Sequence, residues 1–465
     1  MMKTISHILS ILVAIAVFTS CSDFLNVKPK GKVIPETTED YEHLLNYAQL
    51  HKTSDTYPNY MTDDIFVPEK DNVTGGFNGL SVPLQNLYTF NKETFGESQD
   101  DKLWGFSYNR IYTYNVIIED IMGTSEGIEV KKRELKAEAL VGRAIEYLTL
   151  VNAYAKHYDY ATASSDPGVP LILDKGIEKS NLKRASVQEV YEQIQKDLAE
   201  AAEDLPEKPV ANSFRASKAV GFGILSRMYL YMGDYSKALD NAKKSLEKNN
   251  QLLDLKKYQV VKPQSYSGRI NVPELIMNPE NIYIRMAPRT YGLSGSVNGS
   301  EDLTNMYDKA KDKRFLLYFT KNIGSLTTEY NLWAPYIRAN LAISTPEIYL
   351  IAAECEARVG SKEEAMKYLN HLRDNRILDN TPLEASDNKE ALKMVLDERR
   401  RELAFWGCTR LIDLKRLNRE PEFSKTIVHE VAGKKYTLAP NDPKYILPIP
   451  PVVLQFNPNM IPNER

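Results

Sequence analysis

The sequence predicts a mainly α-helical protein, a tetratricopeptide-like helical repeat scaffold with a loop-rich inserted subdomain and little β structure. Three observations support this prediction. Residues 103–122 and 133–157 carry apolar side chains at helical spacing. Two later stretches share one spacing of small residues, as tetratricopeptide helix pairs do. A long segment rich in proline, glycine and tyrosine, residues 249–344, separates those two stretches.

The composition excludes several classes of function. With 465 residues, of which 43% are hydrophobic and 26% charged, the chain is an ordinary globular protein with room for a large core. A net charge of -3 gives no basic surface for nucleic acid, so we expect no nucleic-acid partner. The six histidines never cluster, which argues against a transition-metal site, and we expect neither a metal nor a cofactor.

Residues 1–21 have the order of a lipoprotein signal peptide. A positively charged start is followed by an apolar run over residues 8–18, and two small residues precede Cys21. The run is too short to span a bilayer as a helix, so we expect cleavage before Cys21 and acylation of its thiol. Plain secretion is the alternative. The remaining residues, 22–465, would form one domain attached to membrane lipid through Cys21.

Residues 53–95 form the first long irregular segment, which proline and glycine interrupt repeatedly. A loop of this length that is rich in aromatic residues is usually functional. We therefore name Tyr57, Tyr60 and Phe77 as candidate ligand contacts. The aspartate pair that ends at Asp64 has the chemistry to bind sugar hydroxyls or a hard cation, and a solvated turn is the alternative.

The first long helices are expected to build core. Trp104 begins a stripe that passes through Asn115 to Met122 at intervals of three and four residues. This stripe assigns Trp104 to the core, with a ligand platform as the alternative. A buried Asn115 needs a hydrogen-bond partner on the backbone or on a neighbouring helix. Further along, Ser186 and Glu189 form a capping box that starts another helix.

Two stretches look like copies of one repeat unit. Gly233 precedes Ala238 by five residues, and Gly360 precedes Ala365 by the same distance. Small residues at these places let two antiparallel helices approach closely, and such units bury their faces only by stacking. Thr345, which a proline follows, is the expected N-cap of the second unit.

The segment between these units is expected to be an inserted subdomain. The helical scaffold would comprise residues 37–248 and 345–420, the insertion residues 249–344, and a C-terminal tail residues 421–465. A hairpin is expected in this tail around the Ala432-Gly433 pair.

One short part of the insertion is the leading candidate for a ligand site. Its candidate contacts are Tyr330, Asn331, Trp333, Tyr336 and Arg338. No helical stripe accounts for Trp333, so we choose it as the platform, with packing of the insertion against the repeats as the alternative. We expect ligand to bind where this part meets the aromatic loop of residues 53–95.

Arg399 falls on the leucine face of a helix near the C-terminus. A buried arginine must be paired, because an unpaired buried charge is very costly. The candidate partners are Glu398, Glu402 and, after a turn, Asp413. We interpret Arg399 as architectural, and a ligand contact is the alternative.

The residues around Arg399 form a recognisable series. They are Glu398-Arg399, Glu402-Leu403-Ala404-Phe405, Gly407, Arg410 and Asp413-Leu414-Lys415-Arg416. This series resembles the C-terminal signature of the SusD/RagB family, with Trp406 where the family usually has Glu and one extra residue before Arg410. The resemblance implies a SusD-like fold and a lipoprotein on the outer face of the outer membrane. It also implies that the protein captures nutrients for a SusC-like TonB-dependent transporter.

The sequence contains no HExxH, GxSxG, P-loop, dinucleotide fingerprint or CxxC motif, and we expect a binding protein and not an enzyme. Aromatic planes can cover the CH faces of sugars while Asp, Asn and Arg side chains bond the hydroxyls, so an oligo- or polysaccharide is the expected ligand. A peptide ligand, which the RagB branch of the resemblance implies, is one alternative. A structural or adhesive surface lipoprotein is another.

Overall fold

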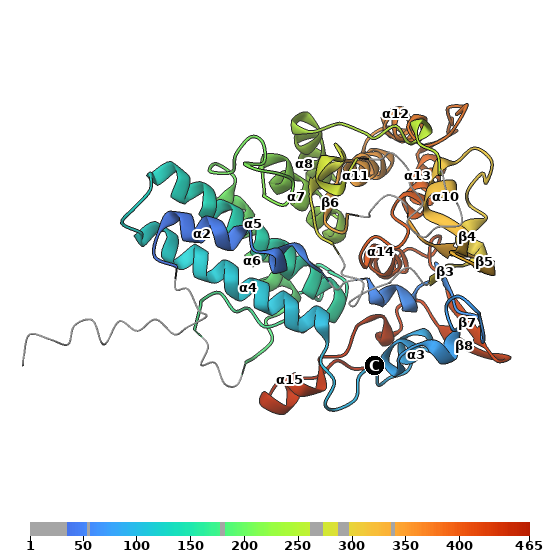
Figure 1. Ribbon diagram of the computed structural model, residues 1–465, viewed down its shortest axis with the longest axis horizontal. Coiled ribbons are helices and arrows are strands. Elements are labelled where there is room, and N and C mark those ends of the chain that lie inside the picture. The colour runs from blue at the N-terminus through green and yellow to red at the C-terminus, as the bar shows by residue number, and fades with distance from the viewer. Residues whose placement is uncertain (1–34, 54–55, 177–181, 261–272, 287–296, 336–339) are drawn as a thin grey trace, which may run out of the picture.

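The computed structural model describes residues 35–465 except for 54–55, 177–181, 261–272, 287–296 and 336–339. The signal segment and Cys21 therefore lie outside the described residues. Helices dominate the described chain and its strands are short, so the fold class predicted from the sequence is confirmed (Figure 1). Within these described ranges no helix is both long and apolar enough to cross a membrane.

The N-terminal half is a stack of helices at one end of the molecule (Figure 1). The stack consists of α2 (Thr38–Leu45), α4 (Lys102–Asp120), α5 (Glu129–Tyr154) and α6 (Val187–Ala201). Helix α5 is the centre of this stack, because α2, α4 and α6 all pack against it and most of its residues are buried. Gly142 allows the close approach of α4, since a Cβ there would lie 2.3 Å from the ring of Tyr114.

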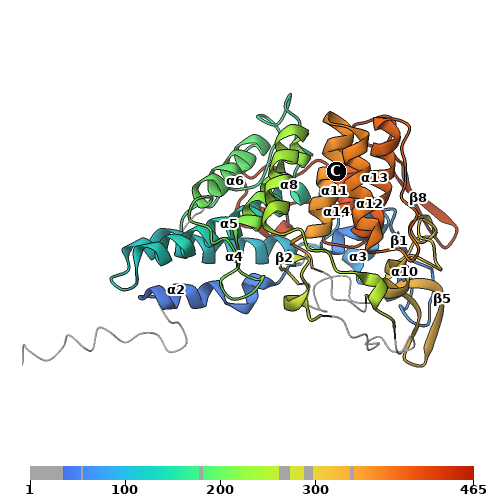
Figure 2. The same ribbon diagram turned by 90° about the horizontal axis from the view of Figure 1, so that it is seen from above.

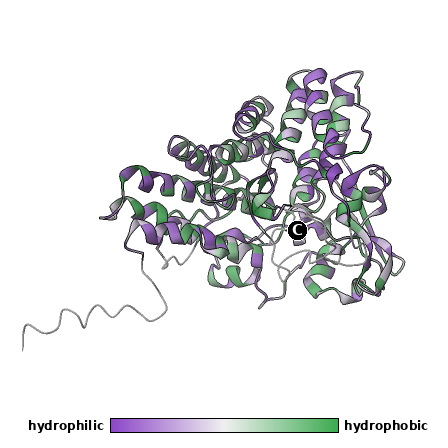
Figure 3. Cartoon of the chain, turned by 45° about the horizontal axis from the view of Figure 1, so that its top comes forward, coloured by the Kyte–Doolittle hydropathy of each residue, from purple (hydrophilic) through white to green (hydrophobic). Residues whose placement is uncertain are grey.

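Two helix pairs continue the scaffold. They are α7 (Lys218–Met232) with α8 (Tyr235–Lys248), and α11 (Thr345–Val359) with α12 (Lys362–Asp374). Helix α11 also contacts α8, so the two predicted repeat units lie side by side (Figure 2). Helix α7 ends at Gly233, whose φ of 79° is the left-handed conformation that glycine supplies at helix ends. The helices carry both hydrophilic and hydrophobic residues, as one-sided burial requires (Figure 3).

Several predicted details of these helices are confirmed. Trp104 is buried in the core, and Ser186 forms a capping box with Glu189 at the start of α6. Asn115 is buried and donates hydrogen bonds to the carbonyls of Ile172 and Asp174.

Two details differ from the prediction. The N-cap of α11 is Ser344, and Thr345 is already the first helical residue. Met122 is 36% exposed, because the chain tightens into a 3₁₀ turn after the end of α4 and leaves the stripe.

Most strands lie in the segment between the two parts of the scaffold. A four-stranded sheet has the order β1–β3–β5–β4, with β1 (Ile65–Phe66), β3 (Val297–Gly299), β4 (Phe319–Ile323) and β5 (Leu326–Trp333). A second pair joins β2 (Asn281–Tyr283) to β6 (Ile343–Ser344), and α9 (Glu301–Thr304) and α10 (Lys313–Tyr318) are short helices of this segment. Strand β1 comes from the N-terminal aromatic loop and therefore ties that loop to the segment. The boundaries proposed for the inserted subdomain stay a prediction.

Helices α13 (Asn388–Glu402) and α14 (Thr409–Leu417) hold the buried ionic contact expected of Arg399. Arg399 is 1% exposed, and its Nε lies 2.9 Å from a carboxylate oxygen of Asp413, so the architectural interpretation is confirmed. Glu398 and Glu402, the other candidate partners, both pair with Arg314. The turn between the helices includes Phe405 and Gly407, both with positive φ.

The chain ends in a hairpin and short helices that cover the lower face in Figure 1. Strands β7 (Ile427–Val431) and β8 (Lys434–Leu438) pair around Ala432 and Gly433, as predicted, and both turn residues have positive φ. Helix α3 (Val82–Tyr88), from the aromatic loop, and helix α15 (Pro451–Phe456), from the tail, complete this face.

Candidate functional site

A groove of about 780 Å³ lies between the four-stranded sheet, α9 and the strand β7. Its walls come from three distant parts of the sequence, namely the aromatic loop, the segment between the scaffold parts and the C-terminal hairpin. Its lining residues include Asp63, Phe66, Tyr88, Asp302, Asn305, Glu329, Tyr330, Asn331, Lys425 and His429. The aromatic loop and the segment therefore meet at a real concavity, as expected for a ligand site.

Two aromatic side chains provide the apolar surface of the groove. Phe66 on β1 and Tyr330 on β5 have ring centroids 5.1 Å apart, and their planes are inclined at 52°. Both side chains are half-buried, so one part of each ring packs against the protein while the rest faces the groove. Such rings offer a flat apolar surface with, in the case of Tyr330, a polar tip.

Trp333 does not line this groove, which corrects the prediction that it is the leading platform. It is 6% exposed and packs against Phe405 with ring centroids 5.3 Å apart. Trp333 lies at the end of β5, where it pairs with Val297 of β3 and Phe319 of β4 and is buried, whereas the residues just before it, Glu329 to Asn331, line the groove. The alternative given for Trp333, packing of this segment against the scaffold, therefore matches the structure.

The other predicted contacts divide into three groups. Asn331 lines the groove beside Tyr330. Tyr60 is buried in the core, Phe77 packs against the Tyr88 ring, and the hydroxyl of Tyr57 lies 2.9 Å from Asp101; none of these three lines the groove. Tyr336 and Arg338 lie outside the described residues.

Asp63 forms part of the polar wall of the groove. Its carboxylate accepts hydrogen bonds from Arg410 at 2.8 and 2.9 Å and from Lys425 at 2.9 Å. Burial alone would raise the pKa of Asp63, but Arg410 and Arg400 outweigh burial and hold it well below its usual range. Asp63 is therefore a fixed anion that positions the cations around it.

Asp64 does not line the groove and is fully buried beside Asp63. Arg400 donates to it at 2.7 Å, and burial raises the pKa of Asp64 despite that contact. The solvated turn considered for this pair is thus wrong. A hard cation also fits poorly here, because Arg400, Arg410 and Lys425 already surround the two carboxylates.

Lys425 links the base of the groove to its rim. Its ammonium lies 2.9 Å from Asp63 and 2.8 Å from Asp302 on the short helix α9. The side chains of Lys425 and Asp302 are 37% and 65% exposed, so this part of the contact can exchange partners with a ligand at small cost.

His429 fixes the hairpin to the aromatic loop at the back of the groove. Its imidazole stacks on Tyr88 at 4.0 Å and on Phe90 at 4.7 Å between ring centroids. The two ring nitrogens lie 2.7 Å from the Tyr88 carbonyl and 2.9 Å from the Thr62 carbonyl. Burial lowers the pKa of His429, although the two carbonyls oppose that shift.

The sequence analysis missed Phe66, Lys425 and His429 as site residues. Phe66 had a weak signal, since it belongs to the same aromatic loop as the named residues. Lys425 and His429 had none, because only the fold brings the C-terminal hairpin to a loop more than 300 residues earlier, as in the bond between His429 and Thr62.

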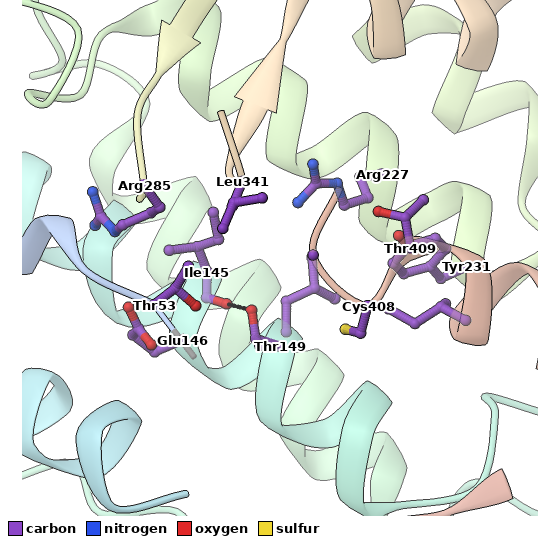
Figure 4. A pocket seen from close by; sticks show the side chains of 13 residues that line it. Thr53, Ile145, Glu146, Thr149, Arg227, Tyr231, Arg285, Leu341, Cys408 and Thr409 are labelled. Carbon is purple, nitrogen blue, oxygen red and sulfur yellow. Dashed lines mark hydrogen bonds between the residues drawn. The ribbon is translucent and has the colours of Figure 1, made fainter. Parts of the chain in front are cut away.

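A smaller cavity of about 40 Å³ lies between α5, α7 and the turn before α14 (Figure 4). Glu146, Arg227 and Arg285 are among its polar lining residues. Its size suits a few water molecules and not a ligand. In the part of the chain that the structure describes, no group of three or more His, Cys, Asp or Glu side chains is arranged to hold a metal ion.

Comparison with protein families gives two matches. Residues 23–230 match a SusD-like model described as starch-binding associating with outer membrane, and residues 294–465 match the model of the SusD family. A curated relative, SusD-like protein P2 of Formosa agariphila, is 25% identical, and the alignment covers 98% of each chain.

Solved structures share the fold. A SusD superfamily protein from Bacteroides thetaiotaomicron superposes with a TM-score of 0.71 at 22% identity, covering 92% of this chain and 100% of that one. A laminarin binding SusD-like protein superposes with a TM-score of 0.63 at 19% identity, covering 92% of this chain and 99% of that one.

Proposed function

Because the chain belongs to the SusD family, we propose that it is a cell-surface lipoprotein that captures glycans in the groove beside Tyr330. It would deliver the captured glycan to a SusC-like TonB-dependent transporter in the outer membrane. The observation that carries this proposal is the half-buried Phe66–Tyr330 pair, which faces a groove with polar walls.

The chemistry of the groove suits an oligosaccharide. Sugar rings have weakly polar CH faces, which can lie on the Tyr330 and Phe66 rings. Asn331, Asn305 and Glu329 line the same groove and can exchange hydrogen bonds with hydroxyl groups. A volume of about 780 Å³ is within the range of ligand-binding clefts.

A binding role fits these side chains better than hydrolysis. Glycoside hydrolysis needs one carboxyl group that is kept protonated and a second one that is free to attack or to activate water. Asp63 is held as an anion by its arginine partners, and Asp302 is paired with Lys425. The remaining acidic side chains of the lining, Glu301, Glu329 and Glu430, are exposed, so the groove offers no pair of buried carboxyl groups among the residues that the structure describes. We therefore propose capture without chemical conversion.

The direct test of the proposal is a glycan array probed with the protein lacking residues 1–21, beside a library of short peptides. We expect binding to at least one glycan class and no comparable binding to peptides. Binding to peptides alone would favour the RagB-like alternative, and binding to neither would favour a structural or adhesive role.

Attachment to lipid through Cys21 is a separate part of the proposal. Growth with a labelled fatty acid should mark the wild-type protein and leave Cys21→Ala unmarked, because only the thiol of Cys21 is available at the predicted cleavage site. Equal labelling of both proteins would refute lipid attachment at this position.

Delivery to a transporter can be tested by gentle detergent extraction and pull-down. From cells grown on the nutrient, we expect a barrel protein of much larger mass to be recovered with this chain. Recovery of this chain alone under those conditions would count against the partnership.

A further inference from the structure

A second cavity, of about 410 Å³, lies beyond the C-terminal end of α5. The loop after α5, helix α14 and the last residues of the chain form its walls. Its lining includes Lys415 and Arg184 together with the apolar Pro167, Pro443 and Ile446. The glycan groove and this cavity share no lining residue, so a ligand in the cavity is independent of the proposed function.

Lys415 is a buried cation that has no carboxylate partner among the described residues. It is 6% exposed, and its ammonium donates to the carbonyls of Asn152 at 2.6 Å and Ala155 at 2.7 Å. An ammonium has three hydrogens, so these two bonds leave one hydrogen for the cavity. Burial lowers the pKa of Lys415 to about 7.

Arg184 is a second cation of this kind. Within the described chain its guanidinium donates to backbone carbonyls, namely those of Gly168, Ile461, Tyr154 and Pro167. Four bonds use four of its five N–H groups. Burial lowers the pKa of Arg184 to about 10.

These two residues differ from three buried arginines of the core that have carboxylate partners. Arg314 pairs with Asp312, Glu398 and Glu402, Arg376 pairs with Glu280 and Glu402, and Arg416 pairs with Glu354 and Asp413. In the rest of this cavity wall the cations are already matched, Lys156 with Asp166 and Arg419 with Asp159. Of the cations that the structure describes in this wall, Lys415 and Arg184 are therefore the uncompensated ones.

The pKa of His157 is also affected by the positive charges near this cavity. His157 lines the cavity, its Nδ1 is buried without a hydrogen-bond partner among the described residues, and burial together with Lys415, Arg416 and Arg419 lowers its pKa well below the usual value. An anion bound in the cavity would offset the positive electrostatic potential that these cations create around His157.

We propose that this cavity is a binding site for a small organic carboxylate, held by Lys415 and Arg184. A carboxylate suits the site better than a dianion, because Asp159, Asp166 and Asp442 line the same cavity and repel excess negative charge. The apolar walls accept the body of an organic acid. The carboxylate can belong to a free acid or to an acidic sugar unit.

Calorimetry with D-glucuronate, D-glucose and acetate tests the site and distinguishes a free organic acid from an acidic sugar unit as its ligand. We expect D-glucuronate to bind the wild-type protein at least tenfold more tightly than neutral D-glucose. Acetate binding as tightly as glucuronate identifies a site for free acids, whereas glucuronate binding at least tenfold more tightly than acetate identifies a site for sugar acids. Absence of binding by both carboxylates would overturn the proposal.

Proton uptake gives a second readout. An anion favours the charged form of Lys415, so binding at pH 8 should be accompanied by uptake of close to one proton, measured in buffers of different ionisation enthalpy. Cys408 and His157 interact electrostatically with Lys415. The other charged or titratable residues that line the cavity are Lys156, Asp159, Asp166, Arg184, Arg419, Asp442, Tyr445 and Glu464. Lys415→Met should therefore lose the uptake together with at least tenfold in affinity.

Two further variants complete the test, one as a control and one as a replacement if Lys415→Met does not fold. Lys132→Met is the control for loss of a buried lysine, because Lys132 is 5% exposed, donates to a backbone carbonyl and lies near the N-terminal end of α5. Lys132 also pairs with Glu129 at 3.3 Å, and its variant should bind glucuronate as the wild type does. If Lys415→Met does not fold, Asn441→Asp replaces it. Asn441 lines the cavity with a φ of 61° that aspartate also tolerates, so the added charge should weaken glucuronate binding at least tenfold. Unchanged affinity in a folded Lys415→Met, or in Asn441→Asp, would contradict the proposal.

Discussion

At the scale of single residues, this protein stabilises its buried charges by close pairing. Arg399 contacts Asp413, which in turn accepts a hydrogen bond from Arg416 at 2.8 Å. Glu354 accepts from the same Arg416. Removing one member of such a group strands a charge in the interior, which costs more than the intact pair contributes.

We predict that Arg399→Ala lowers the free energy of unfolding by about 3–5 kcal/mol, because it leaves the buried Asp413 with one fewer cation. Urea unfolding measures this change. The matched control is Arg133→Ala, whose side chain is 45% exposed and pairs with Asp204 at the surface. The control should change stability by about 1 kcal/mol or less. Similar effects of the two substitutions would mean that Arg399 is solvated.

At the scale of elements, close helix packing depends on glycine at one point of the α4–α5 contact. A Cβ on Gly142 would meet the Tyr114 ring at 2.3 Å, whereas a Cβ on Gly105 of α4 would meet nothing within 4 Å. We predict that Gly142→Ala destabilises the protein by about 1–3 kcal/mol through overpacking. Gly105→Ala should be neutral or stabilising by up to about 1 kcal/mol, because alanine favours helix. Thermal melts of both variants decide, and a stabilising Gly142→Ala would contradict the packing.

The elements also show which parts of the structure were predictable from the sequence. Long stripes such as the one through Trp104 predict helices well, because one apolar face must be buried wherever the helix lies. Strand β5 gives no such signal, and Tyr330, Trp333 and Tyr336 were therefore interpreted as one surface. The structure buries Leu332 and Trp333 at the end of β5, whereas Tyr330 is half-buried and lines the groove. Tyr330 therefore takes the place of Trp333 as the candidate platform.

At the scale of the whole molecule, the groove depends on contacts between ends of the chain. Lys425 and His429 bind Asp63 and Thr62 across more than 350 residues of sequence. No periodicity in the sequence predicts these contacts, because they form only when the folded scaffold brings the two ends of the chain together. The helical scaffold was thus predictable from local pattern. The groove was predictable in its general location and in two of its residues, Tyr330 and Asn331, but not in the rest of its lining.

The buried carboxylates also predict the acid stability of the whole fold. Burial opposes ionisation of Asp63, Glu402 and Asp413, but their arginine partners outweigh it and lower the pKa of each below its ordinary value of 3.8 or 4.5. Between the lowered and the ordinary pKa the unfolded chain binds more protons than the folded one, so stability falls as pH falls through this range. Thermal midpoints should begin to fall below about pH 6.5, where the unfolded chain protonates histidines such as His157 and His429 whose pKa burial lowers in the fold, and should drop more steeply below about pH 4. A level midpoint down to about pH 3 would show that these pairs contribute little.

The central claim is that ligand lies on Tyr330 in the groove and not on Trp333. Calorimetric titration with the best glycan from the array tests it in three variants whose folding is checked by circular dichroism. Tyr330→Ala should lose at least tenfold in affinity, about 1.4 kcal/mol, with its melt retained. Trp333→Phe should melt earlier yet bind normally, and Tyr160→Ala, an exposed tyrosine that does not line the groove, should change neither. Wild-type affinity in Tyr330→Ala, or lost affinity in a folded Trp333→Phe, would contradict this account.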